Sequence, residues 1–435
     1  MRHRIVLVLV SASVLAIAGA AVGATPKTRM VSVTALGDPG NAESYAASIS
    51  ANGRFIAFAS DASDLVPDDT LGHTDIFVRD MRTGETTRAS VRSNGAEANE
   101  ASDYPSISST GRYVAFQSNA SNLVTGDTNG EIDVFVHDTS TGKTKRVSID
   151  SAEAQALGGM STGSSLSADG SRVAFESEAT NLVASDGNAL SDVFVRDITA
   201  GTTARVSVRF NGGEVNGYSR DPWISPDGEW VVFRSVGRFG GTDVGSDNDV
   251  FIHRLSSGKT ARVSVLPDGT EPDASSEAPS VSANGEFVAF VSEASDLVPD
   301  DGSGQRDVFV WTRATGEFER ISVDTLGGDI SDGATASGTP PTISWDGRYV
   351  AFDSGADDIV SDDGNTSRDA FVRDRESDTT IRVSLTSAGA ERDATNELAV
   401  ISADGRFVTF ESDGKFTAGD VVDGFVDVFR RGPLF

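Results

Sequence analysis

Short apolar runs separated by glycine-containing turns recur along this chain. In residues 191–208, SDVFVRDITAGTTARVSV, two apolar runs flank one such turn. A turn of the form Ser-x-Asp/Asn-Gly, or a close variant, ends at seven glycines spaced 57 to 62 residues apart: Gly53, Gly111, Gly170, Gly228, Gly285, Gly347 and Gly405. Self-similarity at a fixed period is typical of repeat architectures, so the sequence predicts seven copies of one unit.

Each unit predicts four short strands. In the second copy the first strand is PSIS (105–108) and the second is RYVAF (112–116), joined by a tight turn that needs positive φ. The third strand is DVFV (133–136), and a Thr-Gly turn leads to the fourth, KRVSI (145–149). We find no helical period in the repeats.

The apolar pattern separates inner strands from an outer one. The second and third strands carry consecutive apolar residues, which predicts burial on both faces. The fourth strand alternates and carries an arginine that we expect to protect an exposed edge; it recurs as Arg88, Arg146, Arg205, Arg262, Arg320 and Arg382. A small antiparallel sheet with only its last strand exposed is a propeller blade. The expected fold class is therefore all-β, a seven-bladed β-propeller of four-stranded antiparallel blades.

The two ends of the chain predict how the ring closes. The seventh unit stops at DVFRRGPLF, after its third strand, and RMVSV (29–33) near the N-terminus matches the fourth-strand pattern. We expect this N-terminal strand to complete the last blade. A ring of six or eight blades, or an open stack, is the alternative.

The repeats resemble a known family. SADGRFVTFES (402–412) and SPDGEWVVFRS (225–235), with DVFV or DVFI further on, are similar to the WD40-like propeller repeats of the TolB family. The resemblance covers residues 28–435 and implies a propeller. It says little about function, because such propellers serve envelope-complex subunits, peptidase regulatory domains and other exported proteins. The chain departs from TolB itself in having no room for an α/β domain before the propeller.

The first 24 residues and the composition indicate where the protein works. Residues 1–24 read as a secretory signal peptide, with an uncleaved membrane anchor as the alternative. Residues 25–435 then form a single propeller domain that is periplasmic or secreted. The net charge of −29 disfavours nucleic acid and anionic membranes, and is compatible with basic partners, cations or solubility alone. With no cysteine, stability must come from core burial.

The long connections carry a second regularity. They join the second strand to the third and the fourth strand to the next blade, so all of them should reach one side of the disk, which we call the long-loop face. Six units show Asp-x5-Asp there, and we selected as candidate metal ligands Asp69, Asp75, Asp127, Asn129, Asp133, Asp186, Asn188, Asp192, Asp301, Asp307, Asp363, Asn365 and Asp369. Several oxygens in one turn suit calcium. The alternative is that these side chains pin their own loops without metal.

The fourth unit breaks the symmetry of the ring. Residues 217–241 concentrate aromatic and basic side chains in an otherwise acidic protein, and the candidate ligand-binding residues are Tyr218, Arg220, Trp223, Arg234, Arg238 and Phe239. Aromatic residues with arginine are typical of binding hot spots. The alternative is that the tryptophans fill space between blades and the arginines pair with neighbouring acids.

Candidate catalytic residues are scarce. Ser161 lies in a Gly-x-Ser-x-Gly match without the strand–turn–helix context of a hydrolase, and the histidines lack metal-ligand spacing. We therefore expect no catalytic residue. The first functional hypothesis is an exported non-catalytic module that binds a protein or glycan of the cell envelope or surroundings. The alternatives are a hydrolase or lyase with its site at the channel mouth, and a calcium-dependent adhesion protein.

Overall fold

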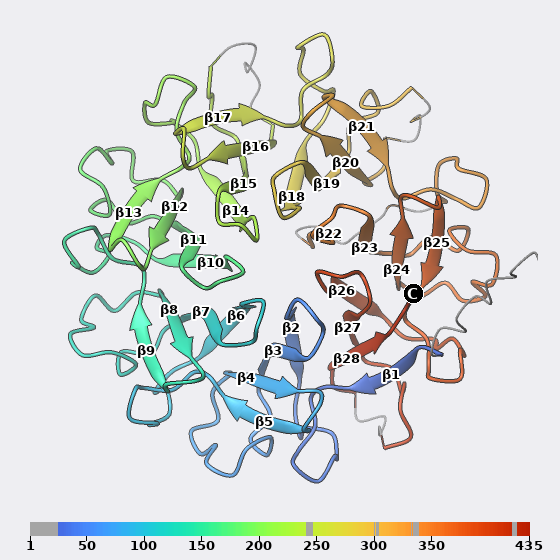
Figure 1. The fold of residues 1–435 in the computed structure, drawn as a ribbon, viewed down its shortest axis with the longest axis horizontal. Coiled ribbons are helices and arrows are strands. Elements are labelled where there is room, and N and C mark those ends of the chain that lie inside the picture. The colour runs from blue at the N-terminus through green and yellow to red at the C-terminus, as the bar shows by residue number, and fades with distance from the viewer. Residues whose placement is uncertain are drawn as a thin grey trace, which may run out of the picture.

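The computed structural model describes residues 25–240, 247–299, 301, 304–331, 333, 339–419 and 424–435. The predicted signal peptide, residues 1–24, lies outside these ranges. Seven four-stranded antiparallel sheets surround a central axis (Figure 1). The predicted seven-bladed all-β propeller is confirmed. Among the described residues no helix is long and apolar enough to cross a membrane.

The strands occupy four positions in each blade, numbered outward from the axis (Figure 1). The innermost strands are β2 (Ser44–Ile49), β6 (Ser102–Ile107), β10 (Ser161–Leu166), β14 (Ser219–Ile224), β18 (Ser276–Val281), β22 (Thr342–Ile343) and β26 (Asn396–Ile401). The second strands are β3 (Phe55–Ser60), β7 (Tyr113–Ser118), β11 (Arg172–Ser177), β15 (Trp230–Ser235), β19 (Phe287–Ser292), β23 (Tyr349–Ser354) and β27 (Val408–Ser412).

The third and outermost strands follow the same order of blades. The third strands are β4 (Asp75–Asp80), β8 (Asp133–Asp138), β12 (Asp192–Asp197), β16 (Asp249–Arg254), β20 (Asp307–Thr312), β24 (Asp369–Asp374) and β28 (Asp427–Gly432). The outermost strands are β5 (Glu85–Arg88), β9 (Lys143–Arg146), β13 (Thr202–Arg205), β17 (Lys259–Arg262), β21 (Glu317–Arg320), β25 (Thr379–Arg382) and β1 (Lys27–Met30).

The ring closes through the N-terminal strand, as expected. β1 pairs antiparallel with β28, and Met30 lies opposite Phe429. The strand begins and ends earlier than the predicted range 29–33, because beyond Met30 the chain turns inward and the Ser32 hydroxyl donates to the buried carboxylate of Asp427 at 2.6 Å. Pairing the first strand with the last removes the open edges that would otherwise remain.

The observed strand bounds differ from those predicted in two systematic ways. The innermost strand of the second blade begins at Ser102, three residues before the predicted Pro105. The outermost strand ends at Arg146 rather than Ile149, because the next residues turn inward and Val147 is buried. The early start places residues such as Tyr104 within the innermost strand.

The blades are held by aromatic contacts within and between them. Within every blade a phenylalanine of the second strand faces one of the third, with ring centroids 5.6 to 6.0 Å apart. Between blades, six of the seven turn glycines lie against an aromatic ring at the start of the second strand of the neighbouring blade, whereas Gly228 lies against Arg172. At Gly111, with φ of 77°, an added Cβ would lie 2.4 Å from the ring of Phe55. The repeated glycine thus meets a conformational and a steric requirement.

Candidate functional site

The innermost strands surround an axial cavity of about 690 Å³. Six of these strands contain a β-bulge, and each bulge has one residue with φ between 49° and 59°: Ala46, Tyr104, Gly163, Asp221, Ala278 and Leu398. All six line the cavity, together with Pro340 of blade 6. Five of them are not glycine, although positive φ is unfavourable for side chains with a Cβ. The bulge therefore places an unequal ring of side chains along the cavity wall.

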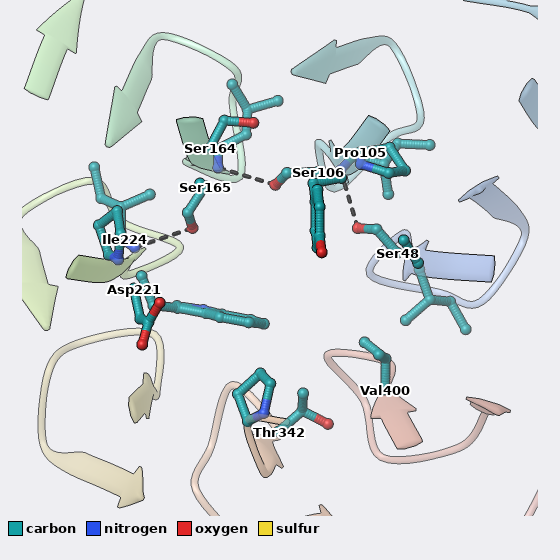
Figure 2. A pocket seen from close by; sticks show the side chains of 18 of the residues that line it. Ser48, Pro105, Ser106, Ser164, Ser165, Asp221, Ile224, Thr342 and Val400 are labelled. Atoms are coloured by element: carbon teal, nitrogen blue, oxygen red, sulfur yellow. Dashed lines mark hydrogen bonds between the residues drawn. The ribbon is translucent and has the colours of Figure 1, made fainter. Parts of the chain in front are cut away.

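Hydroxyl groups connect neighbouring innermost strands around much of this wall (Figure 2). Each accepts a hydrogen bond from a backbone amide of the next blade at 3.0 to 3.1 Å; the pairs are Ser48 with Ile107, Ser106 with Leu166, Ser165 with Ile224, and Thr342 with Ile401. Trp223 and Val400 occupy the equivalent positions in blades 4 and 7 and have no hydroxyl. The hydrogen-bonded ring is thus interrupted at these two positions and also in blade 5, where the Ser280 hydroxyl has no hydrogen-bond partner among the described residues.

Two aromatic residues line the cavity at positions where they lower the stability of the fold. Tyr104 is 60% exposed and has φ of 50°. Trp223 is partly buried and replaces a bridging hydroxyl. Neither choice is explained by local stability, because the tyrosine strains the backbone and the indole cannot accept an amide hydrogen bond. Both rings present apolar surface to the cavity.

A charged group borders the cavity where blades 3 and 4 meet. Glu176 accepts from the Thr162 hydroxyl at 3.1 Å and from the Asp221 backbone amide at 2.9 Å. Burial raises its pKa, and the nearby charge of Asp221 adds to the rise. The Asp221 carboxylate in turn pairs with Arg234. Carboxyl groups and an arginine therefore converge near the axis from two blades.

This convergence was missed because the predicted first strands began too late. Their Ser, Ile, Val and Thr residues repeat with little variation, whereas Tyr104, Asp221 and Thr162 lie before them on the observed strands. A period-2 pattern cannot reveal a strand start that contains a bulge. Comparing residues at equal repeat positions would have shown that these sites differ between blades.

The structure separates the candidate ligand-binding residues of blade 4. Trp223 lines the cavity and Arg234 lies beside Asp221. The Arg220 guanidinium lies over the Tyr218 ring, 5.2 Å from its centroid, and Arg238 is exposed. Phe239 requires a correction: it is only 1% exposed and stacks on Phe251 with centroids 3.8 Å apart. Its ring fills the core beneath the loop, so it is not available to a ligand.

The weak catalytic candidate Ser161 is also structural. Its side chain is buried, and its hydroxyl lies 2.8 Å from that of Ser177 on the neighbouring strand. Equivalent serine pairs recur in other blades. The position therefore belongs to the repeat.

The Asp-x5-Asp pairs do come together, but around an arginine. Arg205 Nη1 lies 3.1 Å from Asp192 and 3.7 Å from Asp186, and its side chain is 5% exposed. The same arrangement joins Arg88 to Asp69 and Asp75, Arg146 to Asp127 and Asp133, and Arg382 to Asp363 and Asp369, while Arg320 lies 3.7 Å from Asp301 and Asp307 accepts from Ser322. The expectation that these arginines protect an exposed edge is therefore wrong. They are buried because they hold the long loops.

A third acid completes most of these clusters. Glu214 approaches Arg205 to 2.8 Å, and the equivalent residues are Glu97, Glu271, Asp329 and Glu391. Each follows its arginine by nine residues, a spacing that the sequence already contained. In blade 2 that position is Gln155. The nine-residue spacing in the sequence therefore marks the third carboxylate around the arginine.

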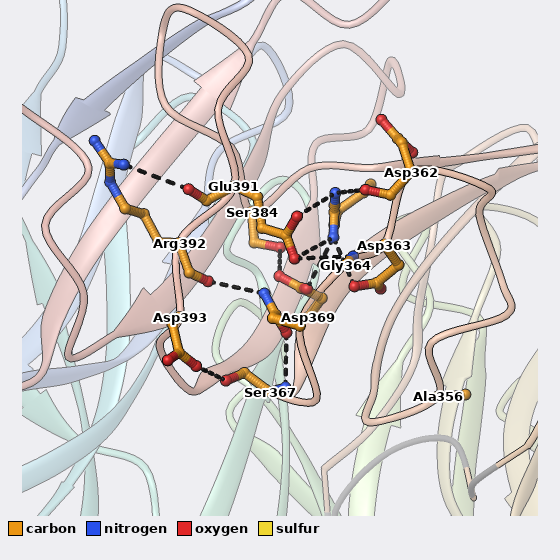
Figure 3. A network of polar contacts seen from close by, with 12 residues as sticks. Ala356, Asp362, Asp363, Gly364, Ser367, Asp369, Ser384, Glu391, Arg392 and Asp393 are labelled. Atoms are coloured by element: carbon orange, nitrogen blue, oxygen red, sulfur yellow. Dashed lines mark hydrogen bonds and ion pairs between the residues drawn. The ribbon is translucent and has the colours of Figure 1, made fainter.

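Among the described residues, three of the clusters have a geometry that could hold a metal ion. Carboxylate oxygens lie within 4.8 Å of one another in the groups Asp69–Asp75–Glu97, Asp186–Asp192–Glu214 and Asp363–Asp369–Glu391. In each group the guanidinium already supplies positive charge, as Figure 3 shows for the cluster around Asp363 and Asp369. Burial raises the pKa of Asp192 to about 6, so the buried carboxylates are not fully compensated.

The candidate asparagines act on their own loops. The Asn188 amide donates to the carbonyl of Val215 at 2.8 Å, and its oxygen accepts from the Leu190 amide at 2.9 Å. Asn365 makes the corresponding contacts with Arg392 and Ser367, and Asn129 those with Ala156 and Glu131, with a further hydrogen bond to Asp133. These contacts match the loop-pinning alternative.

Comparison with known proteins shows a shared fold. The sequence matches no protein-family model and no curated protein. An oligogalacturonate lyase solved with manganese is 13% identical, with a TM-score of 0.54, over 94% of this chain and 90% of that one. A prolyl endopeptidase is 10% identical, with a TM-score of 0.51, over 91% of this chain and 50% of that one.

TolB from Acinetobacter baumannii is 15% identical, with a TM-score of 0.43 over 76% of this chain. The chain spans 63% of the length of that TolB chain. At identities below 25% these likenesses concern the fold and not the activity. With its seven four-stranded blades, the chain is a seven-bladed β-propeller.

Proposed function

We propose that this protein is an exported, non-catalytic binding module whose axial cavity holds part of a protein or glycan ligand of the cell envelope or surroundings. The observation that carries this proposal is Trp223, which lines the cavity at a position where blades 1, 2 and 3 have a bridging serine. A stabilising hydrogen bond has been exchanged for exposed aromatic surface. Such exchanges are expected at functional sites.

The lining suits a ligand with flat apolar faces and polar edges. Tyr104 and Trp223 supply rings for stacking, and prolines such as Pro105 and Pro279 add rigid apolar wall. Glu176, Asp221 and the serine hydroxyls supply hydrogen-bonding groups at the border. Sugar rings and proline-containing or aromatic peptide segments both present this combination.

The test is a ligand screen with matched variants. Oligosaccharides and peptides are titrated into the protein, and binding is followed by calorimetry. Trp223→Ser should abolish binding while restoring a bridging hydroxyl, so the fold should remain intact. Val400→Ser introduces the same hydroxyl in blade 7, the other blade that lacks one at this position, and should keep binding. Equal affinity of the wild type and both variants would exclude the cavity as the site.

An enzymatic alternative has one specific observation in its favour. Glu176, with its raised pKa, and Asp221 both line the cavity, and a carboxyl group with a raised pKa can serve as a general acid. Oligogalacturonates are the first substrates to assay, because an oligogalacturonate lyase has a similar fold. Turnover that Glu176→Gln abolishes would establish this alternative over simple binding.

Calcium-dependent adhesion is the third candidate, and the clusters around Arg88, Arg205 and Arg382 are its support. Calcium would have to enter beside or displace a buried guanidinium. Thermal unfolding with excess EDTA and again with millimolar calcium tests this directly, because an ion bound only by the native state raises the melting temperature.

A further inference from the structure

The closing blade differs from its neighbours in charge beside its second strand. In blades 1, 2 and 6 an arginine precedes the first aromatic residue of that strand and pairs with an aspartate at the end of the third strand. The pairs are Arg54–Asp80, Arg112–Asp138 and Arg348–Asp374, with N–O distances of 2.6 to 2.9 Å. Each guanidinium also lies over the adjacent aromatic ring.

Blade 7 keeps the arginine and loses the acid. Arg406 lies over Phe407, 5.8 Å from its centroid, but the position of the aspartate is occupied by Gly432. The nearby carboxylate of Asp404 accepts from the Ser402 hydroxyl and from the backbone amide of Arg406, and it makes no ion pair with a described residue. Arg406 is exposed, and its guanidinium forms no ion pair with a described residue.

A second cation occupies an apolar position of the same blade. Arg430 stands where the other six blades have Val78, Val136, Val195, Ile252, Val310 and Val372. Its guanidinium lies 4.6 Å from the centroid of Phe407, and Nη1 donates to the Gly53 carbonyl at 2.6 Å. Its Nε is buried without an acceptor. Arg313 and Arg375 make similar contacts in other blades but also pair with Glu286 and Glu319. Burying a cation without an acid is costly, and Arg430 has no acidic partner among the described residues.

The pairing of β1 with β28, which closes the ring, places a third cation beside Arg430. Arg29 of β1 lies directly opposite Arg430, and like charges at such positions repel each other. Burial and, after it, the charge of Arg29 lower the pKa of Arg430 to about 10. Within the described part of the chain, Arg29, Arg406 and Arg430 form no ion pair, although the protein as a whole has a net charge of −29.

We propose that Arg29, Arg406 and Arg430 form a binding site for an oxyanion group, a phosphate or a carboxylate, at the seam between blade 7 and blade 1. Guanidinium groups suit such ligands because their planar donors match two oxygens at once. The anion would supply the negative charge that Asp80, Asp138 and Asp374 supply in their blades. This site is separate from the axial cavity and does not depend on the function proposed for it.

The experiment uses inorganic phosphate as the probe. Thermal unfolding of residues 25–435 is followed with increasing phosphate at constant ionic strength, with chloride as the reference anion, and affinity is measured by calorimetry. We expect phosphate to raise the melting temperature. Arg430→Val, which restores the residue type of other blades, should fold and lose the shift, and Arg406→Gln should weaken it at least tenfold in affinity.

Arg112→Gln is the matched control, because Arg112 already has an aspartate partner, and it should respond to phosphate as the wild type does. A parallel arm with phosphatidylglycerol vesicles separates a soluble anion from a lipid headgroup: vesicle binding that needs Arg430 assigns the site to a headgroup. The proposal is overturned if neither probe binds, or if Arg430→Val and Arg406→Gln bind both probes as well as the wild type.

Discussion

Arg205 Nη1 lies 3.1 Å from a carboxylate oxygen of Asp192, at the start of strand β12, and 2.8 Å from one of Glu214 in the following loop. Its Nη2 also donates to the Ser185 carbonyl at 2.9 Å. One buried side chain thus fastens two long loops to the outer strand of their own blade. The repetition of this arrangement explains why an exposed-looking strand carries an arginine in six of its seven copies.

Removing this arginine should destabilise the protein strongly. Arg205→Met leaves three carboxylates within 4.8 Å of one another without their cation, and we expect a loss of about 3–5 kcal/mol in the free energy of unfolding. Urea denaturation measures the change. Arg112→Met removes a half-exposed ion pair and should cost much less, because solvent screens an exposed pair. Similar losses for both variants would contradict the role assigned to Arg205.

The same variant should acquire a response to calcium. Without the guanidinium, Asp186, Asp192 and Glu214 offer the oxygens that a hard cation requires. We expect millimolar calcium to raise the melting temperature of Arg205→Met more than that of the wild type, as measured by calorimetry. An equal shift in both proteins would mean that calcium binds elsewhere or beside the arginine.

We expect Glu411 to make the free energy of unfolding decrease as pH rises. Burial raises its pKa from 4.5 to about 8, so between these values the native state holds a proton that the unfolded state has released. The free energy of unfolding should therefore fall as pH rises through this window, by about 1.4 kcal/mol per pH unit for this one group. Glu411→Gln should remove that part of the slope.

The measurement is urea denaturation from pH 5 to pH 9 for wild type and variant. Other buried carboxyl groups with raised pKa values, such as Asp307 and Asp369, contribute to both proteins, so the difference between the curves isolates Glu411. Glu100→Gln, at an exposed loop position, should leave the wild-type slope intact. Parallel curves for wild type and Glu411→Gln would refute the prediction.

Alanine variants of two glycines should distinguish the cost of backbone strain from the cost of a steric clash. Gly95 has φ of 84° and open space around it, whereas Gly111 has φ of 77° and faces the Phe55 ring. Gly95→Ala should cost about 1–2 kcal/mol from backbone conformation. Gly111→Ala should cost clearly more, because its Cβ would overlap the ring of the preceding blade. Equal losses in denaturation experiments would mean that Phe55 moves aside freely.

Ring closure should be measurable through β1. Deleting residues 25–31 removes the strand that pairs with β28 and leaves that edge exposed. We expect a lower melting temperature and self-association, detected by light scattering. An excess of a peptide with the sequence of residues 25–33 should suppress the association by occupying the edge. A monomeric truncated protein of unchanged stability would contradict the role of β1.

Much of the architecture could be predicted because it rests on local patterns. The Ser-x-Asp/Asn-Gly turns need positive φ, and the apolar runs in strands such as β7 and β8 need burial on both faces. Each property is a requirement of neighbouring residues, and the seven-fold repetition of these requirements leaves few arrangements other than a ring. Even the closing strand was detectable, because Ser32 preserves the repeat pattern.

The candidate site was less predictable because it depends on contacts between blades. Trp223 was a candidate ligand-binding residue from the sequence, but only the ring placed it on one cavity with Tyr104. Arg430 became conspicuous only when its equivalents proved to be buried valines and isoleucine. Phe239 was misassigned because a loop residue can fold back into the core. Similarly, the arginine of the outer strands appeared exposed until the loop carboxylates were seen to surround it.

The sequence by itself therefore determined the repeat unit, its strands, the number of blades and the means of closure, because these follow from periodicity and turn chemistry within some sixty residues. Only the tertiary structure decided which side chains face the axis, which carboxylates an arginine neutralises and where cations remain unpaired. Those properties arise from distances between residues that are far apart in the chain, and no local pattern encodes them.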